Sequence, residues 1–286
     1  MIKPMLSDEA FLVDVAAARK EAAAAGVFRL WWLGQAGFLL QWNDRHLLID
    51  PYLSDSLTKK YAATDKPHVR MTERVIDPQR LDFIDAVTSS HNHTDHLDHE
   101  TLWPLMRVNP ELRMVIPEAN RAFVAGRLGC DPSWPLGCDN GLTVEVNGFA
   151  LTGVASAHES LEQDEQGRYK HLGYLIRFGR WAIYHSGDAV PYDGMAERLR
   201  SLNEGRPLDV VMLPINGRLP ARRVPGNFFG DEAASFAKSV SARLAVPMHY
   251  EMFEFNTATP DLFAAEAKRI GQPYRVLRCG ERWTSG

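Results

Sequence analysis

The chain has 286 residues, of which 45% are hydrophobic and 24% are charged, a composition typical of a globular protein. A net charge of −4 and a pI near 6.2 argue against a nucleic-acid-binding surface, which would be basic and clustered. The three cysteines have no CxxC spacing, so they predict neither a disulfide framework nor cysteine metal ligands. No apolar stretch approaches the roughly 20 residues that span a bilayer, and the first residues lack the profile of a secretory signal. We therefore expect a cytoplasmic protein without membrane insertion.

The N-terminal segment predicts a helix that lies on the main body. Ser7, followed by two acidic residues, is typical of a helix start, and the alanine-rich run that follows ends at Gly26, a natural terminating residue. We expect a single domain over residues 1–286, with residues 1–26 as its N-terminal helical extension.

The next segments predict strands and then a long connection. Short apolar runs in residues 27–49 indicate a strand meander. Residues 51–82 are polar and predict a connection with a short helix; connections of this length are often lids. His46 and His68 are expected at surface or turn positions rather than as metal ligands.

Beyond residue 98, predicted strands and helices alternate. Strands are expected at residues 113–117, 142–146, 149–157, 172–179, 181–188, 208–215, 243–249 and 274–279, and helices at residues 100–107, 118–129, 193–204, 230–243 and 260–269. Because a strand-rich stretch followed by alternation occurs twice, we predict two packed sheets with helices outside, an α/β fold arranged as a four-layer αββα sandwich.

The most informative stretch is AVTSSHNHTDHLD, residues 86–98, which carries the pattern H-x-H-x-D-H after an apolar run. Imidazole suits zinc and other transition ions, and carboxylate suits these and harder cations. In an extended turn, residues two apart project to the same side, so His91 and His93 can bind one ion. Asp95 and His96 then face a second, adjacent ion.

Other polar residues follow apolar strands in the same way. His158, Asp188, Asn216 and His249 each come after such a strand. In α/β folds, the loops at the carboxyl ends of strands converge on the functional site. We therefore expect these residues to meet the histidine-rich loop at one rim, where the two histidines and the aspartate complete two coordination shells.

The order of these motifs resembles the metallo-β-lactamase superfamily: HNHTDH, then His158, then Asp188 in HSGD, then His249. The likeness spans nearly the whole chain from Leu30 onward. More narrowly, WWLGQAGFLL, IDPYLSDS, LPINGR and VPMHYEMFEFN look like the L-ascorbate-6-phosphate lactonase branch. The resemblance implies a metallo-β-lactamase fold and a metal-dependent hydrolase.

The resemblance also implies two divalent metal ions, bridged by a water or hydroxide. The implied ligands are His91, His93 and His158 for the first ion, Asp95, His96 and His249 for the second, and Asp188 for both. Histidine-rich ligation favours zinc, while the carboxylates also tolerate manganese or iron. Flavodiiron oxygen-reducing relatives typically carry glutamate where this chain has His93, which favours hydrolysis over redox chemistry.

The charge balance of such a centre favours a hydroxide nucleophile and an anionic substrate. Two divalent ions bring +4, and two carboxylates and a hydroxide remove three, which leaves about +1; bound water then has a pKa around 7. We expect Asp95 and Asp188 to be catalytic. Asp95 either shuttles a proton to the leaving group or serves only as a ligand.

Further residues are expected around the ions. Those expected to bind substrate are Gln35, Tyr192, Asn216, Arg218 and Tyr250. Arg218 could bind a phosphate or carboxylate bidentately, or lie on the surface as a solvated arginine. His171 and His185 are expected to orient metal ligands.

The sequence therefore favours a metal-dependent hydrolase of a small, anionic lactone or phosphorylated sugar derivative. A phosphodiesterase similar to N-acyl-phosphatidylethanolamine phospholipase D is an alternative, which would call for an apolar entrance near residues 53–75. Outside hydrolysis, a non-haem iron oxidoreductase and a non-catalytic metal-dependent binding protein remain open. The expected partner is a small-molecule substrate and no nucleic acid, and a homo-oligomer is left open.

Overall fold

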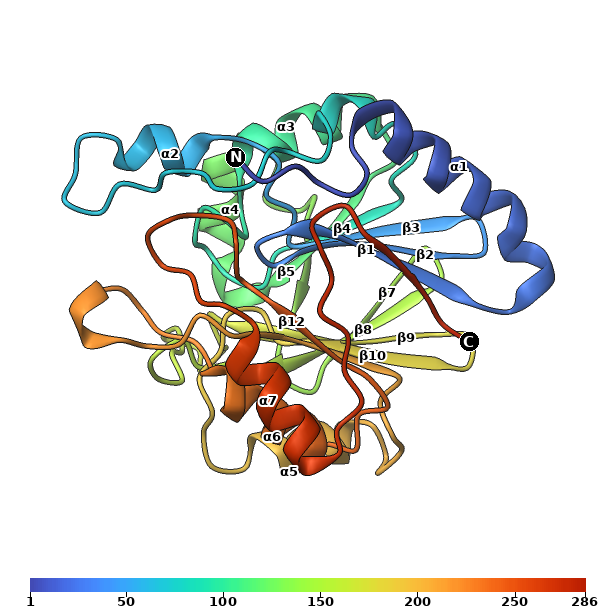
Figure 1. Cartoon of the computed structure of the whole chain (residues 1–286). Coiled ribbons are helices and arrows are strands. Elements are labelled where there is room, and N and C mark those ends of the chain that lie inside the picture. The colour runs from blue at the N-terminus through green and yellow to red at the C-terminus, as the bar shows by residue number, and fades with distance from the viewer.

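The computed structural model describes residues 1–286, apart from the side chains of residues 22–25. Two β-sheets lie face to face, with helices on the outer side of each (Figure 1). These layers confirm the predicted αββα sandwich.

The first sheet has seven strands in the order β13-β1-β2-β3-β4-β5-β6. They are β1 (Phe28–Gly34), β2 (Gly37–Trp42), β3 (Arg45–Ile49), β4 (Ala86–Thr88), β5 (Arg113–Pro117), β6 (Leu136–Cys138) and β13 (Arg282–Thr284). The pairs from β13 to β3 are antiparallel, and those from β3 to β6 are parallel. The meander predicted over residues 27–49 is thus the antiparallel half of this sheet.

The second sheet has six strands in the order β12-β11-β10-β9-β8-β7. They are β7 (Thr143–Val146), β8 (Phe149–Ala155), β9 (Leu172–Phe178), β10 (Trp181–His185), β11 (Val210–Pro214) and β12 (Ala245–Met248). Strands β10, β11 and β12 run parallel, so their carboxyl ends meet at one edge.

Helices cover both sheets and form part of the long connection. The α-helices are α1 (Asp8–Ala25), α2 (Ser56–Tyr61), α3 (His99–Val108), α4 (Arg121–Leu128), α5 (Met195–Leu202), α6 (Gly230–Ser239) and α7 (Asp261–Ile270), and the short 3-10 helices are η1 (Pro78–Arg80), η2 (Glu118–Asn120) and η3 (Pro220–Arg222). Helices α1 and α3 lie over the first sheet and α5, α6 and α7 under the second (Figure 1). Helix α1 ends at Gly26 as predicted, with the left-handed φ of 58° that glycine tolerates best.

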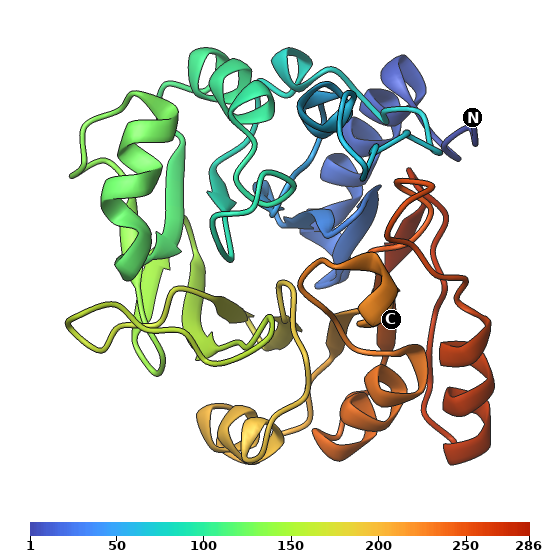
Figure 2. The ribbon, with the colours of Figure 1, turned by 90° about the vertical axis from the view of Figure 1, so that its left-hand side faces the viewer.

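The two sheets are joined by aromatic side chains at the end remote from the histidine-rich loop. Phe28 of β1 meets Phe178 of β9 and Trp181 of β10 edge to face, with ring centroids 5.2 and 5.1 Å apart. Trp42 of β2 approaches Phe149 of β8 in the same way. Each such pair contributes about 0.5–1.5 kcal/mol beyond its burial. This end is therefore firmly packed, and the loops at the opposite edge of the sheets face the viewer in Figure 2.

The structure corrects the predicted last strand. Residues 274–279 form only a single bridge, between Tyr274 and Ala245, and the chain then crosses to the first sheet, where Gly280 donates to the Trp32 carbonyl. A segment that passes between sheets cannot continue one ladder, so the closing strand is β13. Strand β6 was not predicted, because it contains Gly137 and follows Pro135, and both residue types are uncommon in strands.

His46 is also placed differently from expectation. Its side chain is fully buried in β3, in edge-to-face contact with Phe83 at a centroid distance of 5.0 Å. Both ring nitrogens lack hydrogen-bond partners among the described residues, because the nearest carboxylate oxygen, on Asp85, is 3.9 Å away. Burial lowers the pKa of His46 to about 3.

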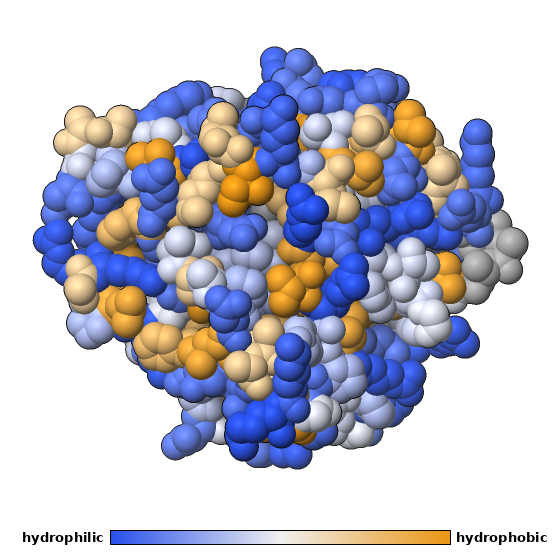
Figure 3. Space-filling model, in the orientation of Figure 1, coloured by the Kyte–Doolittle hydropathy of each residue, from blue (hydrophilic) through white to orange (hydrophobic). Residues whose placement is uncertain are grey.

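Among the described residues, no helix is long and apolar enough to cross a membrane. On the face seen in Figure 3, hydrophilic residues predominate and apolar residues form scattered small groups.

Candidate metal centre

The predicted metal ligands all follow the carboxyl ends of strands. The histidine-rich loop lies between β4 and α3, and the other ligands lie in the loops after β8, β10 and β12. Two groups have their ligand atoms within 4.8 Å of one another: His91, His93, His158 and Asp188 in the first cluster, and Asp95, His96, Asp188 and His249 in the second cluster. Each cluster draws side chains from both sheets.

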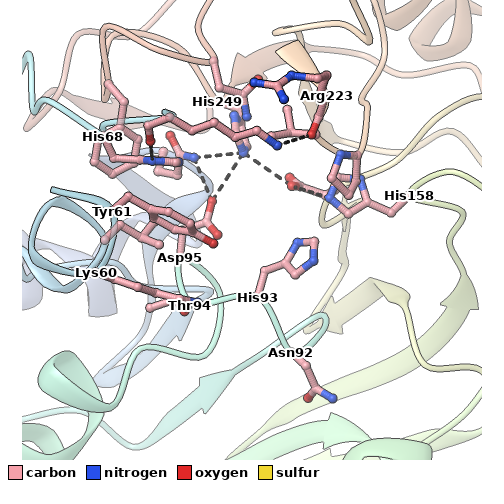
Figure 4. Close-up of a pocket in the computed structure, with 18 of the residues that line it drawn as sticks. Lys60, Tyr61, His68, Asn92, His93, Thr94, Asp95, His158, Arg223 and His249 are labelled. Carbon is pink, nitrogen blue, oxygen red and sulfur yellow. Dashed lines mark hydrogen bonds and ion pairs between the residues drawn. The ribbon is translucent and has the colours of Figure 1, made fainter. Parts of the chain in front are cut away.

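Asp188 joins the two clusters. One carboxylate oxygen lies 3.3 Å from His96 Nε2, and the other lies 3.3 Å from His158 Nε2 and 3.4 Å from His249 Nε2. Figure 4 shows His158 and His249, the two imidazoles nearest this second oxygen. The loop that carries Asp188 packs tightly against the histidine-rich loop. A Cβ atom at Gly187 would lie 2.6 Å from the Ser90 Cβ, so only glycine permits this approach.

The electrostatics of the clusters suit cation binding. Burial would raise the pKa of Asp188, but His249 and His96 outweigh burial and hold that pKa well below its usual value. Burial would likewise lower the pKa of His249, yet Asp188 and Asp95 raise it to about 9. Burial and neighbouring imidazoles lower the pKa of His91 well below its usual value, which keeps His91 in the neutral form that binds metal.

Buried atoms without partners provide a direct test of fit to metal ions. His91 Nε2, His96 Nε2 and Asp188 Oδ1 make no hydrogen bond of acceptable geometry among the described residues. Buried polar atoms are normally satisfied, so three orphans in one place call for an explanation. Imidazole nitrogens and a carboxylate converging at this spacing are the donor set of a transition-metal site. The residues therefore fit the metal ions that the sequence predicts.

Asp50 supports the second cluster, a role that was not predicted. It is fully buried at the end of β3, and its carboxylate accepts a hydrogen bond from His96 Nδ1 at 2.7 Å. Thr88 Oγ1, at 2.8 Å, and the Ser90 hydroxyl also donate to it. Such a carboxylate fixes the ring orientation and tautomer of a metal ligand. The signal was present, because Asp50 follows an apolar strand just as Asp188 does.

The two histidines expected to orient metal ligands lie near the clusters. His171 stacks on His91, with ring centroids 4.9 Å apart. His185 donates from Nε2 to the Ala36 carbonyl, while its Nδ1 accepts from the Gly187 amide at 3.1 Å and so holds the turn that leads to Asp188.

Of the residues expected to bind substrate, Gln35 alone lines the cavity above the clusters. Its Nε2 lies 2.8 Å from both Asp95 Oδ2 and His249 Nε2. Arg218 instead forms two bonds of 2.6 Å with the Glu232 carboxylate. Asn216 is buried in an amide network with Asn227 and Asn256.

The two tyrosines are also engaged with the protein rather than with the cavity. The hydroxyl of Tyr192 donates to the Ala155 carbonyl, and that of Tyr250 donates to the Leu277 carbonyl. Tyr250 also packs on Trp32, with ring centroids 4.3 Å apart. A polar residue near a strand end can thus be hydrogen-bonded within the protein instead of facing the cavity.

The cavity has a volume of about 470 Å³, within the usual range for small-molecule sites. The long connection over residues 51–82 covers one side of it through Leu57, Lys60, Tyr61, Lys66 and His68. These side chains were not predicted to line a cavity, because they carry no metal-ligand spacing.

Stacked mixed sheets with outer helices and a histidine–aspartate cluster at one edge define a protein of the metallo-β-lactamase fold class. Comparison with known families agrees: the model described as "Beta-lactamase superfamily domain" matches residues 29–249. The chain belongs to this superfamily.

Curated relatives extend over most of the chain. A protein of Methanosarcina mazei named a metal-dependent hydrolase is 27% identical over 245 residues, covering 84% of this chain and 91% of the relative. One of Rubrobacter xylanophilus with the same name is 27% identical over 264 residues, covering 90% and 96%. Among solved structures, a metallo hydrolase of Ignicoccus hospitalis has a TM-score of 0.65 at 21% identity, covering 91% of this chain and 99% of its own. That likeness shows the fold.

Proposed function

We propose that the protein is a metal-dependent hydrolase with two divalent ions, zinc or manganese, at the paired clusters. The observation that carries the proposal is the pair of clusters sharing Asp188 at the floor of a small-molecule cavity. The relatives named metal-dependent hydrolases support it. Divalent ions bound there would supply Lewis-acid activation of water and of a substrate oxygen.

The chain's own residues would position the proton transfers. Asp95 lies at the cavity, and the Gln35 amide holds its Oδ2 at 2.8 Å. We assign Asp95 the transfer of a proton to the leaving group, and Gln35 the role of fixing that carboxylate. The Asp50–His96 bond and the His158 Nδ1 bond to the Gly226 carbonyl, both 2.7 Å, hold ligand rings in orientation. Preorganised groups of this kind lower the cost of reaching the transition state.

For the substrate we propose a small anionic lactone or phosphorylated sugar derivative, as in the L-ascorbate-6-phosphate lactonase branch. The connection that a phospholipase would need as an apolar entrance places Lys60, Lys66 and His68 at the cavity beside Leu57 and Tyr61, so this side of the entrance is of mixed character. The two lysines favour the anionic small molecule over the lipid phosphodiester.

Metal quantitation on the purified protein, followed by lactone and phosphodiester panels with that metal restored, tests the proposal. We expect close to two ions per chain and hydrolysis of lactones in preference to phosphodiesters. A protein that binds no divalent metal, or that hydrolyses nothing with metal restored, would refute it.

A further inference from the structure

The mouth of the cavity carries cations that the metal chemistry does not use. Lys60, Lys66 and Arg127 line it, and none of the three pairs with a carboxylate among the residues that the structure describes. We call these three side chains the cationic rim. They add positive charge to a site that two metal ions would already make positive.

The polar contacts of the rim cations are with neutral groups. Arg127 donates from Nη1 to the Asn92 and Leu97 carbonyls at 2.7 and 3.1 Å, so its guanidinium is anchored to the histidine-rich loop. Lys60 Nζ lies 3.5 Å from Thr94 Oγ1. Figure 4 shows Lys60 beside Thr94 on one side of the opening, and Arg223 on the other.

Neighbouring cationic side chains are paired with carboxylates, and in this the cationic rim differs from them. Lys59 pairs with Glu100 at 2.7 Å, and Arg223, whose carbonyl accepts from Lys66, pairs with Asp65. Like charges gathered without acidic partners repel one another and raise the local concentration of anions. An anionic group on the ligand is what would relieve this repulsion.

The same mouth is also partly apolar. Tyr61, Phe123, Val224 and Pro225 contribute to the lining, and Phe123 is 46% exposed beneath the Arg127 guanidinium, which lies 4.5 Å from its ring centroid. We call these four residues the apolar wall. Exposed apolar surface at a pocket is typical of a ligand-binding region, and an alkyl or aryl group would bury more of it than a polyhydroxylated sugar.

We propose that the substrate is a small organic anion with an apolar body: a phosphate or carboxylate group meets the cationic rim, and an alkyl or aryl group packs on the apolar wall. The inference rests on the proposed function and narrows it, since it favours a lactone or ester with an apolar substituent over a sugar phosphate.

Calorimetric titration of the zinc-loaded protein with four probes tests this assignment: hexyl phosphate, hexanoate, hexanol and inorganic phosphate. The Lys60→Met, Lys66→Met double variant removes two rim charges and keeps most of the side-chain length. Lys59→Met is the matched control, because Lys59 is adjacent but does not line the cavity. Phe123→Ser tests the apolar wall. Thermal unfolding of every variant checks that the fold is retained.

We expect hexyl phosphate to bind at least tenfold more tightly than inorganic phosphate, and the double variant to bind hexyl phosphate about tenfold more weakly, as for two partly exposed charge contacts. Hexanol binding should be unchanged in the double variant, and Lys59→Met should match the wild type. Phe123→Ser should weaken hexyl phosphate but not inorganic phosphate. The stronger of hexyl phosphate and hexanoate identifies the anionic group.

Equal hexyl phosphate affinity in the wild type and the double variant would refute the assignment of the cationic rim as the anion-binding group. If inorganic phosphate bound as tightly as hexyl phosphate, the proposal that the substrate has an apolar body would be refuted. Repeating the titrations on chelator-treated protein separates the rim from the ions: if all hexyl phosphate binding disappears with the metal, the anion binds the ions and the rim assignment fails. If the binding pattern holds but no lactone or ester is hydrolysed with any metal, the proposed function fails while the anion site stands.

Discussion

Replacing Asp50 with asparagine should weaken metal binding at the second cluster more than at the first. The Asp50 carboxylate accepts from His96 Nδ1 at 2.7 Å. Among the described residues, its contact with the first cluster runs through Ser90, whose hydroxyl lies 3.0 Å from His91 Nδ1. Asparagine keeps an acceptor for His96 but removes the negative charge, and the Thr88 hydroxyl can turn to accept from the new amide. The fold should therefore survive.

The size of this effect follows from the contact that is weakened. A buried hydrogen bond to a charged group contributes about 1.5–3 kcal/mol, and removing a supporting carboxylate of this kind costs 10–100-fold in metal affinity, about 1.4–2.7 kcal/mol. We expect a loss in this range for the second ion and a smaller loss for the first.

Competition with a chromophoric chelator gives the stepwise binding constants. Asp209→Asn is the control, because that carboxylate accepts from the Ala182 amide at 2.9 Å next to β11, remote from the clusters. Unchanged constants in Asp50→Asn, or a larger loss at the first ion, would contradict the assigned role of Asp50.

Three further predictions follow from the same structure. His93→Ala should abolish hydrolysis and lower the bound metal; full metal content by elemental analysis would count against the ligand assignment. His46 has a pKa of about 3 when folded, below its unfolded value near 6.5, so the unfolded chain binds the extra proton and stability falls as pH decreases between these values. Relative to His46→Leu, the wild type should lose about 2.3 kcal/mol between pH 6.5 and 4.5 in urea unfolding, and parallel pH profiles would show the shift to be absent. Arg218 pairs with Glu232, which also accepts from the Phe229 amide at the start of α6. Arg218→Met should therefore cost about 0.5–1 kcal/mol of stability with little change in KM. A large rise in KM would show that Arg218 binds substrate after all.

The layers and the grouping of the predicted metal ligands could both be predicted from the sequence, for a simple physical reason. Buried strands give apolar runs, and the polar residues that end them converge at one edge of the fold, as His158, Asp188 and His249 do. The same rule explains why Asn216 was expected to bind substrate. A polar residue at a strand end can be satisfied by other amides, and only the fold shows that Asn227 and Asn256 do so.

The cavity walls could not be predicted in this way. Lys60 and Lys66 lie in a long connection without periodicity, and Arg127 lies on a helix whose sequence shows no link to the histidine-rich loop. Their meeting depends on tertiary packing alone. The misplaced strand at residues 274–279 has a related cause, since its apolar alternation could not reveal that the chain leaves one sheet for the other there.

The division of each cluster between the two sheets has a mechanical consequence. His91 and His93 come from the loop after β4, and His158 and Asp188 from loops of the other sheet. A bound ion would therefore link the two layers at this edge, where the Tyr174 hydroxyl already donates to the Ser89 carbonyl across the layers. A small hinge-like opening of the sandwich would then lengthen metal–ligand bonds directly. Side chains deep between the sheets, far from any substrate, would thereby influence which ion the site prefers.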